Sequence, residues 1–103
     1  KMIKNIETIM AGNPTKNDYR KAAMYYYEEN IYLEKAVKWI DIAFDDSDEL
    51  KYWQLNYKAL INEKAGKFKK AKKYAKLGYQ VALKSNSTDA INTLKIVNDR
   101  LNN

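Results

Sequence analysis

The sequence contains no cysteine and no histidine, and its 103 residues include only one proline and three glycines. Without cysteine there is no disulfide framework. Without histidine the chain lacks the commonest general base and metal ligand. Few prolines and glycines leave little material for tight turns between strands, which favours helices. No apolar run approaches the about 20 residues that a membrane-spanning helix needs.

Arginine is also scarce. Of the 19 basic residues only Arg20 and Arg100 are arginines, so lysine carries most of the formal charge of +6. The charge is unevenly placed, since residues 1–51 hold eight basic and ten acidic side chains while residues 52–103 hold eleven and three. Such asymmetry can indicate an anionic partner. Sites that grip phosphate usually use the arginine fork, however, so the lysine excess disfavours nucleic acid.

No constellation of catalytic residues is visible. The serines at positions 47, 85 and 87 lie in polar breaks, and there is no glycine-rich phosphate loop. The acidic run over residues 45–49 lacks the central glycine and distal glutamate of a calcium loop. We expect it to cap the next helix instead, through Asp46 or Ser47. The sequence therefore predicts a non-enzymatic chain with no catalytic residues, no metal site and no cofactor.

Apolar residues recur at helical spacing through the chain and predict an all-α fold. We expect helices over residues 2–11, 17–30, 33–45, 48–65, 68–85 and 87–101. Gly12, Asn30 and Gly66 are typical of helix ends. Thr15 or Asn17 can cap the second helix and Ser87 the last.

The chain contains an internal repeat. A shift of 35 residues aligns Ala36 with Ala71 and Ala43 with Gly78. Ala71 and Gly78 share one helix face, which lets a neighbouring helix approach closely. With its turn glycine at position 66, this helix–turn–helix pattern resembles the tetratricopeptide repeat. The resemblance implies an α–α superhelix of antiparallel helix pairs in one domain, residues 1–103, with a half repeat over 2–11, repeats over 17–46 and 48–85, and a capping helix over 87–102.

Residues 29–41 and 52–66 also resemble the helical C-terminal tail of a family of uncharacterised exported bacterial proteins, in which a β-rich domain comes first. Arg20 and Leu55 stand where the repeat usually has tryptophan, so the chain would be a divergent member. This resemblance implies a C-terminal fragment of an exported or periplasmic protein. Without it we expect a cytoplasmic location.

In tetratricopeptide proteins the first helix of each repeat lines a concave groove. The resemblance places there Lys21, Tyr25, Trp53, Asn56, Tyr57, Leu60 and Lys64. Aromatic side chains in a groove suit the anchoring of a peptide or protein segment. We expect Trp53 to be partly exposed and Tyr25 to approach it from the neighbouring helix.

Two other roles remain open for these residues. Trp53 and Tyr57 could pack against the capping helix or another domain, since aromatic stripes at helical spacing are usually core. The chain would then be a structural tail on a neighbouring domain of the same protein. Open repeat ends could also pair copies into a homo-oligomer.

Lysines concentrate on the helix expected over residues 68–85. We predict a basic face on its convex side, made of Lys69, Lys70, Lys73 and Lys76. These lysines could contact phosphates or anionic lipid headgroups, or could form a solvated outer face. No aromatic residues interleave with them there, as a stacking site for single-stranded nucleic acid requires.

Overall fold

The computed structural model describes residues 2–102 and contains six helices and no strand in that range. The helices are α1 (Met2–Ala11), α2 (Lys16–Glu29), α3 (Leu33–Ala43), α4 (Tyr52–Lys64), α5 (Phe68–Ser85) and α6 (Thr88–Asn102). The all-α prediction is confirmed. Lys1 and Asn103, the ends of the predicted domain, lie outside the described residues. No helix in the described range has both the length and the apolar character to cross a membrane.

Local side-chain chemistry explains several helix ends. Thr15 caps α2 in a reciprocal box, in which the Asp18 amide donates to Thr15 Oγ1 at 3.1 Å and the Thr15 amide donates to Asp18 Oδ2 at 2.9 Å. Asn30 ends α2 in the left-handed conformation with φ of 58°, and Gly66 turns the chain after α4 with φ of 80°. Ser87 Oγ accepts the Ala90 amide at 3.2 Å and caps α6 as predicted.

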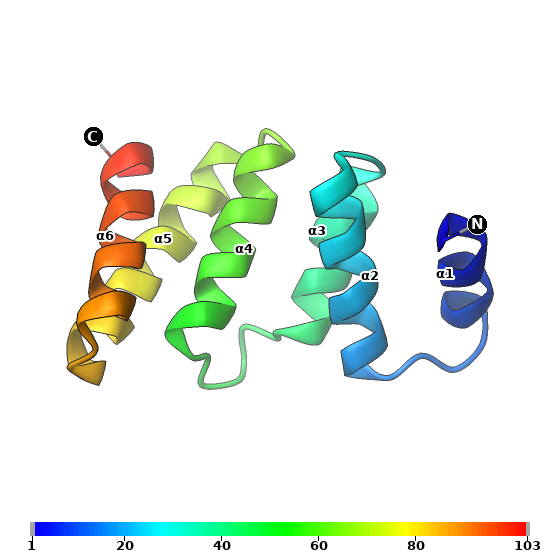
Figure 1. The fold of residues 1–103 in the computed structure, drawn as a ribbon, viewed down its shortest axis with the longest axis horizontal. Coiled ribbons are helices and arrows are strands. Elements are labelled where there is room, and N and C mark those ends of the chain that lie inside the picture. Colours follow the sequence, from blue (N-terminus) through cyan, green and yellow to red (C-terminus); the bar gives the residue numbers. More distant parts are fainter. Residues whose placement is uncertain (1, 103) are drawn as a thin grey trace.

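The helices pack mainly as sequential antiparallel pairs, α2 with α3, α4 with α5, and α5 with α6. In Figure 1, α2, α4 and α6 lie towards the viewer and α3 and α5 lie behind them. We call α2, α4 and α6 the first-helix layer. Helix α1 lies at one end of the row and packs on α2.

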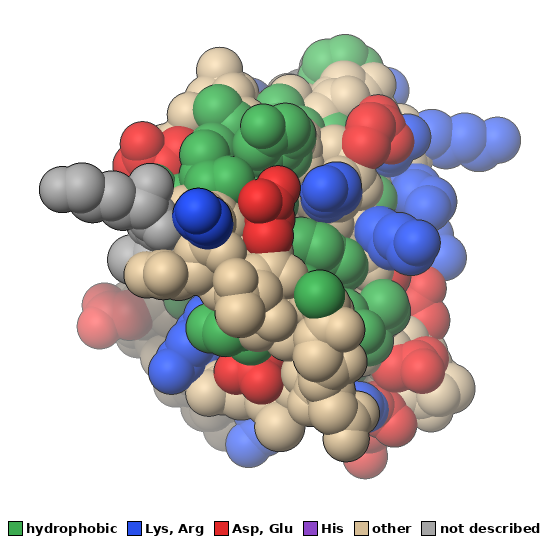
Figure 2. Space-filling view, turned by 90° about the vertical axis from the view of Figure 1, so that its right-hand side faces the viewer, with side chains coloured by type: hydrophobic (Ala, Val, Ile, Leu, Met, Phe, Trp, Pro, Cys, Tyr) green, Lys and Arg blue, Asp and Glu red, His purple; other side chains and the backbone are tan. Residues whose placement is uncertain are grey.

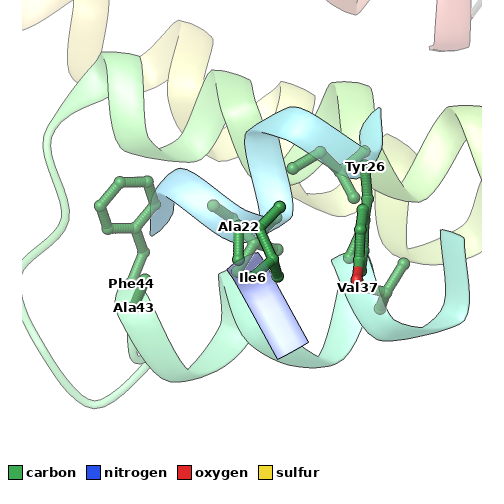
Figure 3. Close-up of a cluster of buried hydrophobic side chains, with 10 residues drawn as sticks. Ile6, Ala22, Tyr26, Val37, Ala43 and Phe44 are labelled. Carbon is green, nitrogen blue, oxygen red and sulfur yellow. The ribbon is translucent and has the colours of Figure 1, made fainter. Parts of the chain in front are cut away.

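Buried apolar side chains of residues 2–102 form three clusters along the row, one in its N-terminal half and two in its C-terminal half, which we treat together as the C-terminal group. The N-terminal cluster is centred on α2 and α3, with Ile6 from α1 and Ile61 from α4 (Figure 3). The C-terminal group joins α4, α5 and α6 through Leu55, Ala71 and Leu94. Because Ile61 belongs to the first group and Leu55 to the second, α4 links the two halves of the core.

The face of small residues on α5 works as predicted. Ala71 and Ala75 have no exposed surface. A Cβ atom added to Gly78 would lie 2.7 Å from Leu94 Cδ1 and 3.3 Å from Leu55 Cβ. Glycine therefore allows α4 and α6 to approach α5 on both sides.

One predicted helix start is wrong. The fourth helix begins at Tyr52, not near residue 48. Asp45 Oδ1 accepts the amide and the hydroxyl of Ser47, both at 2.9 Å, and this local turn competes with helix. The helix is capped later, where Gln54 Oε1 accepts the Lys51 amide at 2.8 Å. Neither Asp46 nor Ser47 caps α4.

Candidate binding surfaces

The predicted groove residues of α2 line a pocket between α1 and α2. Its volume is about 280 Å³, and its lining is Ile6, Ile9 and Met10 from α1 with Asp18, Lys21, Ala22 and Tyr25 from α2. The floor is apolar, whereas Asp18 and Lys21 bring one charge of each sign. Figure 2, which views this end of the molecule, shows hydrophobic side chains at the surface between charged ones.

The capping box also fixes the charge of one pocket residue. A hydrogen bond from the Thr15 backbone, and a second from its hydroxyl, lower the pKa of Asp18 below its usual value. Asp18 is therefore a carboxylate at neutral pH, and the pocket offers both an anion and the Lys21 ammonium to a polar partner.

The predicted groove aromatics of α4 gather around Phe44 at the end of α3. The Trp53 ring meets the Phe44 ring edge-on at a centroid distance of 5.7 Å, and Tyr57 stacks on Phe44 at 6.3 Å. Trp53 remains 39% exposed, which confirms the expected partial exposure. Packing and exposure coexist at Trp53, so its outer edge can still contact a partner.

The expected approach of Tyr25 to Trp53 does not occur, because Tyr25 lines the pocket on the α1 side. Tyr27 reaches α4 instead. Lys64 Nζ donates to the carbonyl oxygen of Tyr27 at 3.0 Å and lies 4.3 Å from the centre of its ring. Lys64 therefore ties two helices of the first-helix layer together.

The two remaining predicted groove residues, Leu60 and Asn56, are at least partly buried. Leu60 is partly buried against the C-terminal part of the core. Asn56 Oδ1 is buried and accepts no hydrogen bond from any described residue. Of the seven predicted groove residues, only Lys21 and Tyr25 share a pocket, while Trp53 and Tyr57 form a second, aromatic patch on α4.

A buried lysine, which the sequence did not single out, organises the connection between α3 and α4. The Lys58 side chain has no exposed surface, and its Nζ donates to the carbonyl oxygen of Phe44 at 2.5 Å and to Asp46 Oδ1 at 2.6 Å. Asp41 Oδ1 lies 3.3 Å away, a charge pair without hydrogen-bond geometry. Tyr74 of α5 donates to Asp46 Oδ2 at 2.8 Å. We call these groups the Lys58 network.

The network stabilises the ionised form of Asp46. Partial burial opposes its charge, but hydrogen bonds from Lys58 and Tyr74 outweigh that effect and lower the pKa of Asp46. Burial, followed by the hydrogen bond to Asp46, raises the pKa of Tyr74. At neutral pH Asp46 is therefore ionised and the Tyr74 hydroxyl keeps its proton, so the hydrogen bond between them can hold α5 to the connection between α3 and α4.

Helical spacing could have revealed Lys58 in the sequence. Lys58 lies three residues after Leu55 and four before Asn62, so all three share the inward face of α4. Asn62 is also fully buried and donates to the carbonyl oxygen of Lys58 at 2.7 Å. A lysine on a buried face requires a carboxylate nearby, and the acids that follow α3 are the closest in sequence.

The predicted basic residues of α5 do not all behave alike. Lys70 lies 4.0 Å from Asp41 and turns towards α3, as does Lys67, which lies 3.3 Å from Glu34. Lys69, Lys73 and Lys76 are exposed, and no acidic group of the described chain lies within 4 Å of their ammonium groups. Within residues 2–102 no three metal-ligating side chains come together.

Comparison with models of known protein families, with curated proteins and with solved structures gives no match to this chain. The candidate surfaces are therefore interpreted from their own geometry.

Proposed function

We propose that the chain is a non-catalytic protein-interaction module of the tetratricopeptide type, which binds a peptide or protein segment along its first-helix layer. The observation that carries this proposal is the pocket between α1 and α2. It combines an apolar floor with the Asp18 carboxylate and the Lys21 ammonium. Pockets of this composition bury an apolar anchor and use a few polar groups to orient it.

The tetratricopeptide assignment is supported by the antiparallel helix pairs and by the internal repeat. Ala36 and Ala71, which are 35 residues apart, are both fully buried, as are Ile40 and Ala75. The equivalent positions of α3 and α5 thus face the core in the same way. A row of such pairs leaves one helix of each pair in a common layer, where an extended partner can contact several helices.

The partner expected here carries an apolar or aromatic residue for the pocket and a second one for the patch at Trp53 and Tyr57. Exposed aromatic edges at the centre of an interface are typical of binding hot spots. Because the pocket carries one negative and one positive side chain, it favours a partner whose anchor residue is flanked by backbone amide and carbonyl groups free to form hydrogen bonds, or by charges of both signs.

The proposal can be tested by selecting peptides from a random display library on the immobilised chain and measuring the affinity of the selected peptides by calorimetry. Ile9→Lys places a charge in the pocket at a residue that is 50% exposed, so the fold should tolerate it. We expect this variant to weaken binding at least tenfold, and Trp53→Ala to weaken it by about 2 kcal/mol.

Ile42→Lys is the matched control, because Ile42 is a 37% exposed isoleucine on α3, outside the first-helix layer and away from the pocket. It should leave the affinity unchanged, and circular dichroism should show native helix content in all three variants. The proposal is wrong if no peptide binds more tightly than about 100 μM, a free energy of about −5.5 kcal/mol. It is also wrong if Ile9→Lys and Ile42→Lys have equal effects.

A structural tail is the second candidate, and the exposed position of Ile9 favours it. A neighbouring domain could cover the apolar end at α1 permanently. In that case the chain would bind no separate peptide, and the display selection would yield none. Ile9→Lys would still weaken the contact between the chain and the neighbouring domain.

A further inference from the structure

Helix α5 carries a lysine strip, which we define as Lys69, Lys72, Lys73 and Lys76. Successive helical residues are rotated by about 100°, so these four side chains project within less than half of the circumference of the helix. All four are exposed, and the opposite face of the helix is buried through Ala71, Ala75 and Gly78. The strip therefore lies on the outer side of α5, with Lys73 at its edge beside the pocket that Leu55 and Tyr74 line.

Within residues 2–102 the strip forms no close ion pair, although Lys73 at its edge lines a pocket with Asp46, Asp48 and Glu49 and helps to lower the pKa of Asp46. The flanking lysines Lys67 and Lys70 pair with Glu34 and Asp41 of α3, but no acidic group of the described residues lies within 4 Å of a strip ammonium. Four like charges on neighbouring turns repel one another. An anionic partner would relieve this repulsion.

Two exposed apolar side chains lie on the same side of α5 as the strip. Phe68 is 54% exposed at the first turn of α5, and Leu83 is 46% exposed four turns later. Both project within about 40° of Lys72 around the helix axis. The four lysines span about 10 Å along the helix axis, and Phe68 and Leu83 lie about 22 Å apart, so Phe68 adjoins the strip and Leu83 lies about two turns beyond its last lysine.

We propose that this surface of α5 adsorbs flat onto an anionic lipid bilayer, with the lysine strip at the headgroups and Phe68 and Leu83 inserted between them. Each lysine near such a surface contributes favourably, and apolar side chains at the interface add to the binding. A nucleic acid fits less well, because arginine is absent from the strip and no aromatic side chain lies between the lysines.

The test is co-sedimentation of the chain with vesicles of phosphatidylcholine alone or with about 30% phosphatidylserine, at 0.15 M and 0.5 M salt. We expect binding to the anionic vesicles only, lost at the higher salt concentration. Replacing the four strip lysines by glutamine should lower the partition coefficient at least tenfold. Phe68→Ala combined with Leu83→Ala should weaken binding several-fold without changing its dependence on salt.

The control variant replaces Lys4, Lys16, Lys51 and Lys95 by glutamine and so removes the same charge from α1, α2, the residue before α4, and α6. It should lose less than threefold. The proposal fails if the wild-type chain does not bind anionic vesicles at 0.15 M salt, or if both glutamine variants lose affinity equally. It also fails if a 20-nucleotide RNA binds more tightly than the vesicles and the strip variant abolishes that binding, since the surface would then recognise nucleic acid.

Discussion

Tyr26 and Tyr74 are both buried tyrosines, but within residues 2–102 only the Tyr74 hydroxyl has a hydrogen-bond partner. Tyr74 donates to the Asp46 carboxylate, whereas the Tyr26 hydroxyl has no hydrogen-bond partner among the described residues. A hydrogen bond to a charged group contributes about 1.5–3 kcal/mol. We therefore expect Tyr74→Phe to lower the free energy of unfolding by about 1–2 kcal/mol, and Tyr26→Phe to leave it unchanged or raise it.

Urea unfolding followed by circular dichroism measures both changes. The two substitutions remove the same atom from two buried tyrosines, so each is the control for the other. Equal losses would mean that the Tyr26 hydroxyl has a partner or that the Asp46 contact contributes nothing.

The Lys58 network also makes stability depend on pH. The folded state lowers the pKa of Asp46 below the unfolded value of about 3.9, so the unfolded chain takes up this proton first as the pH falls. The stabilisation is complete above the unfolded pKa and is lost as the pH drops through about 4 and below. We expect the unfolding free energy of Asp46→Asn to be lower than that of the wild type at pH 7, and to decrease less than that of the wild type on acidification.

Asp46→Asn should cost about 2 kcal/mol or more at pH 7, because it leaves a buried ammonium with a weaker partner. Adding Lys58→Met should then restore part of the stability, since it removes that ammonium and keeps the apolar stem. Thermal melts of the single and double variants between pH 2.5 and 7 provide the comparison. If Asp46→Asn matches the wild type at every pH, the network does not stabilise the fold.

At the scale of elements, the contact of α5 with α4 and α6 depends on one missing side chain. An added Cβ on Gly78 meets the fully buried Leu94 at 2.7 Å, so Gly78→Ala should destabilise the chain by about 1–3 kcal/mol despite the better helix propensity of alanine. Leu94→Val should lower the stability less in the Gly78→Ala variant than in the wild type, because the smaller valine makes room for the added Cβ atom. Gly12→Ala is the control, because the nearest atom lies at 3.5 Å, and it should change stability by less than about 0.5 kcal/mol.

Helices could be predicted from the sequence wherever periodic apolar residues and a cap coincided. The predicted bounds 68–85 are those of α5, since Gly66 and the polar residues 85–87 enclose an unbroken amphipathic pattern. The start of α4 could not be predicted in this way. There an aspartate that binds Ser47 and another that binds Lys58 look like helix caps in the sequence, although one serves a local turn and the other a distant lysine.

The binding surfaces were predictable only in part. Helical spacing places Lys21 and Tyr25 on one face of α2, and both line the pocket. The other wall of that pocket comes from α1, whose position depends on the turn at residues 12–15 and not on periodicity. The clustering of Trp53 and Tyr57 on Phe44 depends similarly on the path of the connection between α3 and α4, which Lys58 holds.

At the scale of the whole molecule, α4 and Leu50 just before it connect the N-terminal cluster with the C-terminal group of buried residues. Ile61 of α4 is fully buried in the N-terminal cluster, while Leu55 of the same helix belongs to the C-terminal group. Ile61→Ala should destabilise the chain by about 2–5 kcal/mol and should weaken the coupling between the halves. Hydrogen exchange should then show amides of α2 and α3 opening before those of α5 and α6.

In the wild type the central amides of α2, α3, α5 and α6 should exchange together, because small domains usually unfold in one step. Ile91→Ala is a suitable comparison, since this partly buried isoleucine of α6 packs against a cluster that contains neither Ile61 nor Leu55. If the two variants leave the order of exchange equally unchanged, α4 is not the coupling element.

The sealed position of Lys58 also makes it a chemical reporter. The chain has 17 lysines, and an amine-acylating reagent should reach the exposed ones in the folded protein, while the Lys58 amine has no surface at which to react. Acylation at this one position would therefore record each opening of the connection between α3 and α4. A mass spectrum of the labelled chain would then time a single internal event against a background of rapidly modified surface amines.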